Sequence, residues 1–135
     1  MRCLVVLMLL AAEALAGPLR VDVKPTTATW SIGKPVDVKL EVVNVSTANV
    51  TFEVMSCGWD ESWKSSDAQL AFRPFDCDKN APQKVALAAG ASRAWTLPMF
   101  AVDGAKLGDH RLTMTFTPRG GSATTSAAVA IKVAK

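Results

Sequence analysis

Apolar and polar residues alternate in short runs along most of this 135-residue chain, and turn-forming residues separate the runs. The clearest run is 36–42, in which four aliphatic residues alternate with Asp37, Lys39 and Glu41. A period of two residues indicates β-strands with one buried face, and no window has the period and caps of an amphipathic helix. The chain is therefore expected to be all-β.

Similar runs recur from one end of the chain to the other. They occupy residues 19–23, 36–42, 50–54, 85–87, 95–99, 112–116 and 129–133. Pro98 places its run at a sheet edge or a bend, because proline has no backbone N–H to donate. Seven or eight short strands separated by turns are typical of an antiparallel β-sandwich.

The first sixteen residues have the composition of an export signal. Arg2 precedes the apolar run 4–12, and small residues precede Gly17, as at sites cut by signal peptidase. The run is shorter than the ~20 apolar residues of a membrane-spanning helix. We therefore expect residues 1–16 to be removed and residues 17–135 to form one domain without a membrane span.

Cysteine usage predicts one disulfide. Cys3 lies in the predicted signal, so Cys57 and Cys77 remain for an oxidising compartment, either secreted or periplasmic. We expect these two residues to be bonded, and the chain-entropy model gives such a bond about 3 kcal/mol of stability. The residues between them form a disulfide-bridged excursion, 57–77.

Several segments carry a resemblance to a known class of domain. They are GKPVDVKLEVVN followed by Ser46, then VTFEV, LAAGAS and GDHRLTMTF. Together they resemble the immunoglobulin-like sandwiches of small exported bacterial proteins. The resemblance implies an all-β, immunoglobulin-like antiparallel β-sandwich of seven to eight strands with one disulfide. The chain is also loosely similar to bacterial intracellular proteinase inhibitors, but it contains no Tyr and so lacks a Tyr-containing segment of that family.

The excursion is expected to leave the sandwich and return as an arm. A hairpin running straight back along strand 50–56 would put Cys77 roughly 20 Å from Cys57, at about 3.3 Å per residue. A disulfide needs Cα atoms within about 7 Å of each other. We therefore predict that the chain runs outward from Cys57, turns at 65–67 and returns to Cys77.

The disulfide also sets a register for this arm. Trp59 is expected to face Phe75, Glu61 to face Arg73, and Trp63 to face Ala71. The candidate binding residues are Trp59, Trp63, Arg73 and Phe75, whose types are enriched at interface hot spots. The alternative is that both tryptophans cap the open end of the sandwich. We place capping ahead, because tryptophans are usually well buried.

Acidic residues at the end of the excursion resemble part of a calcium loop. Asp76, Asp78 and Asn80 have the i, i+2, i+4 spacing of oxygen ligands. The sixth position is Ala81 in place of glycine, and the twelfth is Leu87 in place of glutamate. We therefore expect a solvated turn in which Asp78 and Asn80 hydrogen-bond the local backbone, and we expect no metal or cofactor.

The chain lacks the usual combinations of catalytic residues found in enzymes. His110 is the single histidine and has no serine motif near it, so we expect it to face solvent from a strand. One histidine cannot complete a familiar zinc or copper site. The net charge is +3, and the basic residues form no stripe, so nucleic-acid binding is not expected. The sequons at Asn44 and Asn49 are interpreted as turn residues.

The resulting prediction is an exported, non-enzymatic binding or interaction module that uses the Trp-rich arm 57–80. Its partner is an unidentified protein or envelope ligand. One alternative is a calcium-stabilised domain that uses the acidic loop 76–80. A more distant alternative is a protease-inhibitor-like or accessory domain of an envelope enzyme.

Overall fold

The computed structural model describes residues 17–135, and the predicted export signal at 1–16 lies outside them. This part of the chain is nearly all β, with one short 3-10 helix, η1 (Trp59–Ser62), so the predicted all-β class is confirmed. Its strands are β1 (Leu19–Pro25), β2 (Thr29–Ser31), β3 (Val36–Asn44), β4 (Val50–Met55), β5 (Trp63–Ser65), β6 (Leu70–Ala71), β7 (Pro82–Leu87), β8 (Ser92–Ala101), β9 (Gly108–Leu112), β10 (Met114–Phe116), β11 (Thr124–Thr125) and β12 (Val129–Ala134). None of the helical structure in residues 17–135 is long and apolar enough to cross a membrane.

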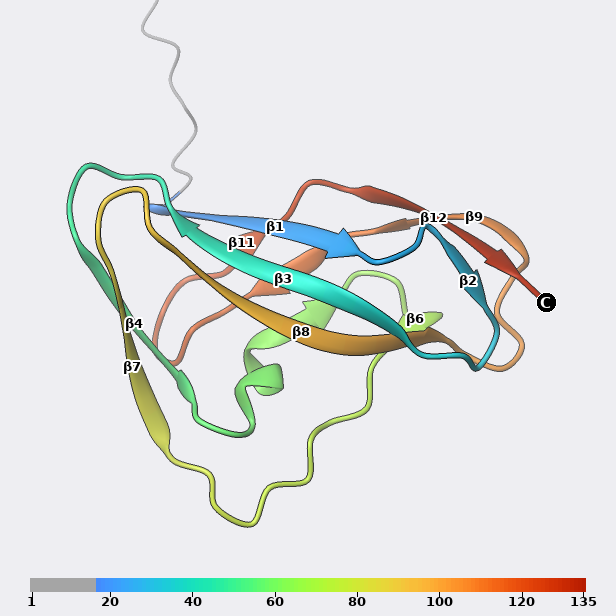
Figure 1. Cartoon of the computed structure of the whole chain (residues 1–135), viewed down its shortest axis with the longest axis horizontal. Helices are drawn as coiled ribbons and strands as arrows, with labels where there is room; N and C mark the ends of the chain where they lie inside the picture. Colours follow the sequence, from blue (N-terminus) through green and yellow to red (C-terminus); the bar gives the residue numbers. More distant parts are fainter. Residues whose placement is uncertain (1–16) are drawn as a thin grey trace, which may run out of the picture.

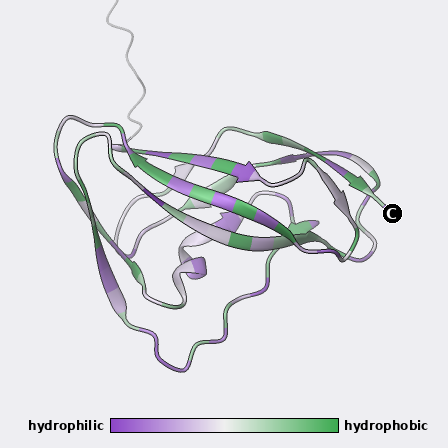
Figure 2. Ribbon diagram, viewed as in Figure 1, coloured by the Kyte–Doolittle hydropathy of each residue, from purple (hydrophilic) through white to green (hydrophobic). Residues whose placement is uncertain are grey.

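The largest sheet has the strand order β1-β3-β8-β6 (Figure 1). Its central pair is antiparallel, with Val38 opposite Leu97 and Leu40 opposite Trp95. Burial alternates residue by residue along most of β3, and Figure 2 shows the matching alternation of apolar and polar residues. The strand predicted over 36–42 is thereby confirmed, because its four aliphatic residues all face the interior.

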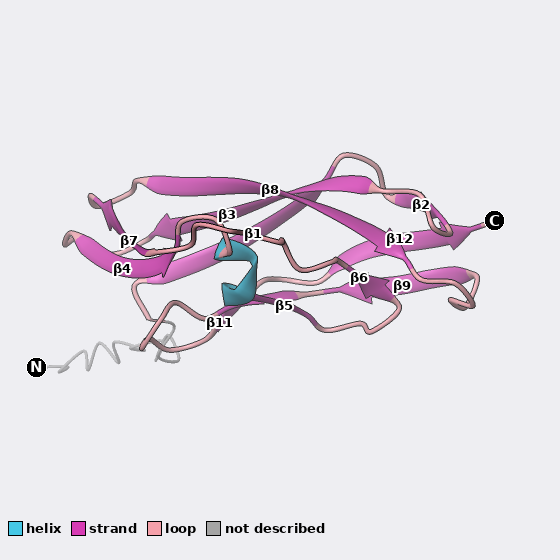
Figure 3. Ribbon diagram, turned by 90° about the horizontal axis from the view of Figure 1, so that it is seen from below, coloured by secondary structure: helices cyan, strands magenta, loops and turns pink. Residues whose placement is uncertain are grey.

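The remaining strands form smaller sheets of order β2-β12-β9 and β11-β10-β5, and β4 pairs with β7 alone. Figure 3 shows β5, β9 and β11 in a second layer, across from β8 and β3. The single run predicted over 112–116 is divided between β9 and β10, which pair with different strands. Thr113 separates them, and its N–H donates to the hydroxyl of Ser66 at 2.9 Å.

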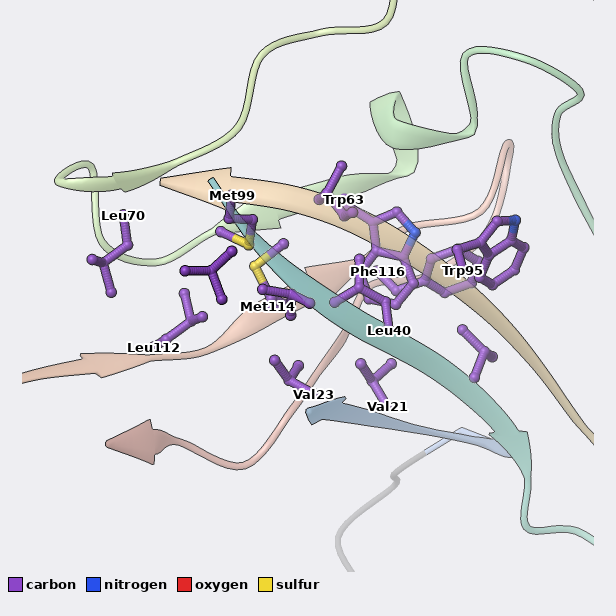
Figure 4. Close-up of a cluster of buried hydrophobic side chains, with 14 of the residues drawn as sticks. Val21, Val23, Leu40, Trp63, Leu70, Trp95, Met99, Leu112, Met114 and Phe116 are labelled. Atoms are coloured by element: carbon purple, nitrogen blue, oxygen red, sulfur yellow. The ribbon is translucent and has the colours of Figure 1, made fainter. Parts of the chain in front are cut away.

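The core lies between the two layers, and Figure 4 shows part of it. The largest side chains that are fully buried are Trp30, Phe116, Leu40, Leu70, Leu97, Met99, Leu112, Met114 and Ile131. They come from strands of every sheet except the β4–β7 pair, whose Phe52, Val54 and Val85 are also buried. Burial of one face of each strand is therefore what holds the layers together.

The predicted disulfide is confirmed. Cys57 and Cys77 are bonded, with 6.0 Å between their Cα atoms. That separation lies within the usual range for a disulfide, so the backbone does not have to shift to form it.

The register predicted for the excursion is wrong. β5 pairs with β10, so Trp63 lies opposite Phe116 instead of Ala71. β6 pairs instead with the end of β8, where Ala71 lies opposite Phe100. The ion pairs within residues 17–135 do not include Glu61 with Arg73. The excursion is divided between two sheets and does not project as a hairpin, because strands from distant parts of the sequence are its pairing partners.

Candidate functional site

The ladder between β6 and β8 uses alternate residues for its hydrogen bonds. The N–H of Val102 donates to the carbonyl of Gln69 at 2.9 Å. Hydrogen-bonded pairs recur at every second residue of an antiparallel ladder. The next such pair is therefore Phe100 with Ala71, which the register places opposite each other.

This ladder stops at a proline. The pair after Phe100 and Ala71 would join Pro98 to Arg73, but Pro98 has no N–H to donate. The chain leaves the sheet after Ala71, and residues 72–77 form no strand. The run containing Pro98 was expected at a sheet edge or a bend; residues 95–99 pair with β3 alone, because β6 pairs with β8 only at Phe100 and Ala101, so the run has one open edge.

A groove of about 370 Å³ opens where the strand pairing stops. Its walls are the departing segment 73–76, Pro98 and Phe100 of β8, and Gly33 and Pro35 of the turn before β3. Three prolines and two phenylalanines make these walls largely apolar and stiff, since proline has a restricted backbone. Such a shape with few charged groups is typical of a binding site.

Arg73 is the basic residue of the groove. Its guanidinium carbon lies 5.4 Å from the ring centroid of Phe100, over the ring. Arg73 is exposed, and it takes part in none of the ion pairs of residues 17–135. Asp76 is the acidic residue that lines the groove. The planar guanidinium is therefore held by an aromatic ring and keeps its donors for a ligand.

Three ties hold the segment that forms the groove wall. The carboxylate of Asp60 is buried, and its Oδ2 accepts a hydrogen bond from the N–H of Phe75 at 3.1 Å. Asn80 Oδ1 accepts hydrogen bonds from the N–H groups of Cys57 and Gly58 at 3.2 and 2.9 Å. The third tie is the disulfide, so the wall is fixed to η1 and to the end of β4.

Gly58 is needed for this arrangement. A Cβ atom at position 58 would lie 2.6 Å from Nδ2 of Asn80, closer than real Cβ contacts. The glycine therefore leaves the space in which the Asn80 side chain reaches the backbone.

The predicted aromatic pair is present, although the predicted hairpin is not. The rings of Trp59 and Phe75 meet edge to face with centroids 5.1 Å apart, and Trp59 also stacks on Trp95 at 5.9 Å. Trp63 is 4% exposed and packs against Phe116 at 4.9 Å. Trp63 thus belongs to the core, as the capping interpretation predicts, and cannot contact a partner directly. Trp59 is half-buried behind Phe75.

The two other predicted binding residues, Arg73 and Phe75, both line the groove. Sequence reasoning missed Phe100, which lies near the end of β8, the longest strand of the described residues, and has no neighbouring motif. The signal that could have found it is Pro98, because the proline marks where β8 loses its neighbour.

The three candidate calcium ligands lie in different environments. Asp76 lines the groove, Asp78 is exposed, and the side-chain oxygen of Asn80 is occupied by backbone N–H groups. The prediction that Asn80 hydrogen-bonds the local backbone is wrong, because its partners are the backbone N–H groups of Cys57 and Gly58, on the other side of the disulfide. Among residues 17–135, no group of three or more His, Cys, Asp and Glu side chains is placed to hold a metal ion.

The solvent-facing position predicted for His110 is wrong. His110 is 9% exposed; its Nδ1 lies 2.7 Å from Oδ2 of Asp67, and its Nε2 lies 2.6 Å from the carbonyl oxygen of Lys106. Two hydrogen bonds raise the pKa of His110. The larger effect comes from the one to the Lys106 carbonyl, and the second largest from the one to Asp67. The loop after β8 folds back over the ring, and Lys106 N–H also bonds Oε1 of Gln69 at 2.8 Å.

Asn44 is more than a turn residue. Its side chain is buried, and its Nδ2 donates to the carbonyls of Ala48, Leu87 and Ala88 at 2.8, 3.0 and 3.2 Å. Its Oδ1 accepts from the N–H and hydroxyl of Ser46. With every polar atom bonded, Asn44 is not available to a glycan, whereas Asn49 is exposed.

No family model matches the chain, and neither does any curated protein. Among solved structures, it is similar to E. coli alpha-2-macroglobulin in its native conformation, with 16% identity and a TM-score of 0.53, over 88% of this chain and 7% of that one. It also aligns with a beta-glucosidase from Listeria innocua in complex with gluconolactone, with 16% identity and a TM-score of 0.39, over 87% of this chain and 16% of that one. The chain spans a small part of either protein. At this identity, the macroglobulin likeness shows the fold alone, and it is consistent with a β-sandwich-like domain.

Proposed function

We propose that this protein is an exported, non-enzymatic binding module built on an immunoglobulin-like β-sandwich, and that the groove beside Pro98 and Phe100 is its binding surface. One observation carries the proposal. Arg73 lies over Phe100 without an ion-pair partner in the described residues, at the mouth of an apolar groove. Arginine and aromatic side chains dominate binding energies at protein interfaces.

The rigidity of the groove wall supports this proposal. Phe75 is held by its hydrogen bond to Asp60 and by the ring of Trp59, and the disulfide closes the same segment. A pre-formed wall lowers the entropy cost of binding, because little has to be ordered when the ligand arrives. The role of Trp59 in this proposal is to support Phe75 from behind.

The disulfide supports an exported location for the protein. Disulfides persist in oxidising compartments and are rare in the cytosol. The proposed location is therefore secreted or periplasmic, and the proposed partner is a protein of the same compartment.

Site-specific photo-crosslinking in cells of the source organism tests this function. A photoreactive amino acid replaces Pro35 or Pro74 in the groove, and Ala130 or Lys132, which are exposed on β12, serve as matched controls. We expect one crosslinked species of defined mass from both groove positions and none from β12. Loss of that species in Arg73→Ala and Phe100→Ala, at an unchanged melting temperature, would support the groove. Equal crosslinking from the groove and from β12, or none from the groove, would exclude it.

A further inference from the structure

Along β8, every second residue turns its backbone groups away from β3. The carbonyl of Ala91, just before β8, accepts a hydrogen bond at 2.9 Å from the N–H of Asn44, the last residue of β3. The carbonyl of Ala101, the last residue of β8, accepts one at 2.9 Å from the N–H of Gly33, in the turn before β3. The backbone N–H and carbonyl groups of odd-numbered residues of β8 therefore point toward β3. Even-numbered residues face the opposite edge, where β6 covers Phe100 but reaches no further.

This edge is open from Ala94 to Pro98. Ala94 and Thr96 each direct an N–H and a carbonyl outward, and Pro98 directs a carbonyl. In residues 17–135, no hydrogen bond pairs the N–H groups of Ala94 and Thr96, because the ladders of β8 are those with β3 and β6. Backbone polar groups are obligatory hydrogen-bonding groups, and an open strand edge is a template for another strand.

The end of the β6–β8 ladder has a defined cause. β6 would continue along this edge if Pro98 could pair with Arg73, but the chain turns away instead and forms the wall of the groove. Among the described residues, β8 therefore has no strand partner on this edge from Ala94 to Pro98. An extended chain along this edge would meet the donors and acceptors of Ala94 and Thr96 and, at the Pro98 end, the groove.

Two arginines mark the ends of the open edge. Arg73 lies over Phe100, and the guanidinium carbon of Arg93 lies 5.6 Å from the ring centroid of Trp95. Neither arginine takes part in an ion pair among the described residues, and Asp76 is the acidic residue of the groove. The charge at both ends therefore complements an acidic ligand.

The edge disfavours pairing with a second copy of this chain. Pairing of β8 with β8 about a two-fold axis would bring the same arginine-flanked edge of both copies together. Each copy would also bring a proline that offers no N–H to the ladder. Like charges and a missing donor both disfavour that arrangement.

We propose that the edge of β8 from Ala94 to Pro98 binds an extended peptide segment of a protein partner, which adds to the sheet as a strand with an acidic side chain against Arg73. This inference rests on the proposed function, since it names the ligand of the same groove. Main-chain hydrogen bonds to Ala94 and Thr96 supply affinity, and Arg73 with Phe75 and Phe100 supplies selectivity.

Peptide selection and amide methylation test the proposal. Random nonapeptides displayed on phage are selected against the purified, disulfide-bonded protein, and an enriched sequence is synthesised with N-methyl groups on alternate amides. We expect acidic sequences to be enriched. Methylation of one alternate set should weaken binding at least about tenfold, and methylation of the other set should change it little, because only one set faces β8. In amide NMR spectra, the N–H protons of Ala94 and Thr96 should exchange more slowly when the peptide is bound.

Charge reversal provides the matched control. Arg73→Glu should weaken the acidic peptide at least about tenfold, whereas Arg111→Glu, at an exposed position of β9, should leave its affinity unchanged. Both variants must keep the melting temperature of the parent protein. Equal weakening by the two variants would overturn the role of Arg73.

The outcomes separate this inference from the proposed function. If both methylated sets bind equally, or if no peptide is enriched while groove crosslinks still form in cells, strand addition is overturned and the binding groove stands. If a concentration-dependent dimer protects the Thr96 N–H, the edge is occupied by a second copy and the inference is also wrong. If neither peptides nor crosslinks are found, both proposals fail together.

Discussion

Asp67 and His110 meet through a 2.7 Å contact between Oδ2 and Nδ1, although the two residues are 43 positions apart in the sequence. The other ring nitrogen of His110 lies 2.6 Å from the carbonyl oxygen of Lys106. Both partners are acceptors, and a neutral imidazole has only one N–H. The protonated ring is therefore the form that satisfies both contacts, which joins the loop after β5 to the loop after β8.

This arrangement predicts that stability falls as the pH rises. The Lys106 carbonyl and Asp67 raise the pKa of His110 in the folded protein above its ordinary value of about 6.5, so folding favours the protonated form. The contribution to the free energy of unfolding is complete below about pH 6.5 and is lost as the pH rises through the raised pKa. Urea unfolding between about pH 5 and pH 9 should show this decline. His110→Gln should show a smaller decline, and an identical pH profile in the variant would contradict the assignment.

Asn44→Ala should destabilise the protein strongly. The change removes five hydrogen bonds and leaves the buried carbonyl of Leu87 without its partner, so we expect a loss of about 2 to 3 kcal/mol. Asn49→Ala is the matched control, because Asn49 lies in the same connection and is exposed. Denaturant midpoints of the two variants measure the difference, and similar midpoints would show that the Asn44 network contributes little.

The two tryptophans of the excursion should differ in effect. Trp63→Ala removes a fully enclosed ring that contacts Trp95 and Phe116, and should cost about 3 to 5 kcal/mol. Trp59→Ala removes a half-buried ring and should cost less, while releasing Phe75 and weakening binding at the groove. Thermal melts and peptide titrations of both variants check this order. A larger loss of stability in Trp59→Ala than in Trp63→Ala would contradict the assignment of Trp63 to the core and of Trp59 to the support of Phe75.

Replacing both Cys57 and Cys77 by Ala should lower the free energy of unfolding by about 3 kcal/mol, because the unfolded chain loses its cross-link. The hydrogen bonds of Asn80 to Cys57 and Gly58 should persist, since they use backbone N–H groups. Mass spectrometry of the parent protein provides the control. Two free thiols in the exported parent, or an unchanged stability in the double variant, would contradict this prediction.

Pro98→Thr should extend β6. The new N–H at position 98 can pair with Arg73, which continues the ladder past Phe100 and Ala71. Hydrogen exchange at residue 98 should then be slow, and the volume of the groove should shrink as segment 73–76 moves toward β8. Fast exchange at residue 98, comparable to that of Thr96, would mean that features other than the proline end the ladder.

Local patterns were sufficient to predict much of the fold. The alternation in 36–42 corresponds to β3 because a strand with one face in the core needs an apolar residue at every second position. Cys57 and Cys77 could be paired because they were the two cysteines outside the predicted export signal. Arg73 and Phe75 were recognised as candidate binding residues from their types, and both line the groove.

The errors arise where distant segments meet. Trp63 was expected opposite Ala71, but β5 gains more by pairing with β10, which buries Trp63 against Phe116. His110 has the spacing of an exposed strand residue, and it is enclosed by the loops after β5 and after β8, which the sequence does not place beside it. Phe100 became part of a site because Pro98 interrupts a ladder between strands that the sequence does not show to be neighbours.

The parallel pair formed by β2 and β12 has a consequence for how the chain folds. Trp30, near the beginning of the described residues, lies opposite Val133, near the end, and both are buried. Closing a loop of this length carries a large entropy cost before any contact compensates it, so this pairing is expected to form late in the folding reaction. Until β12 is in place, β2 has no strand partner. Losing only the final few residues would therefore leave β2, the strand that carries the buried Trp30, without its partner and favour aggregation over the native state.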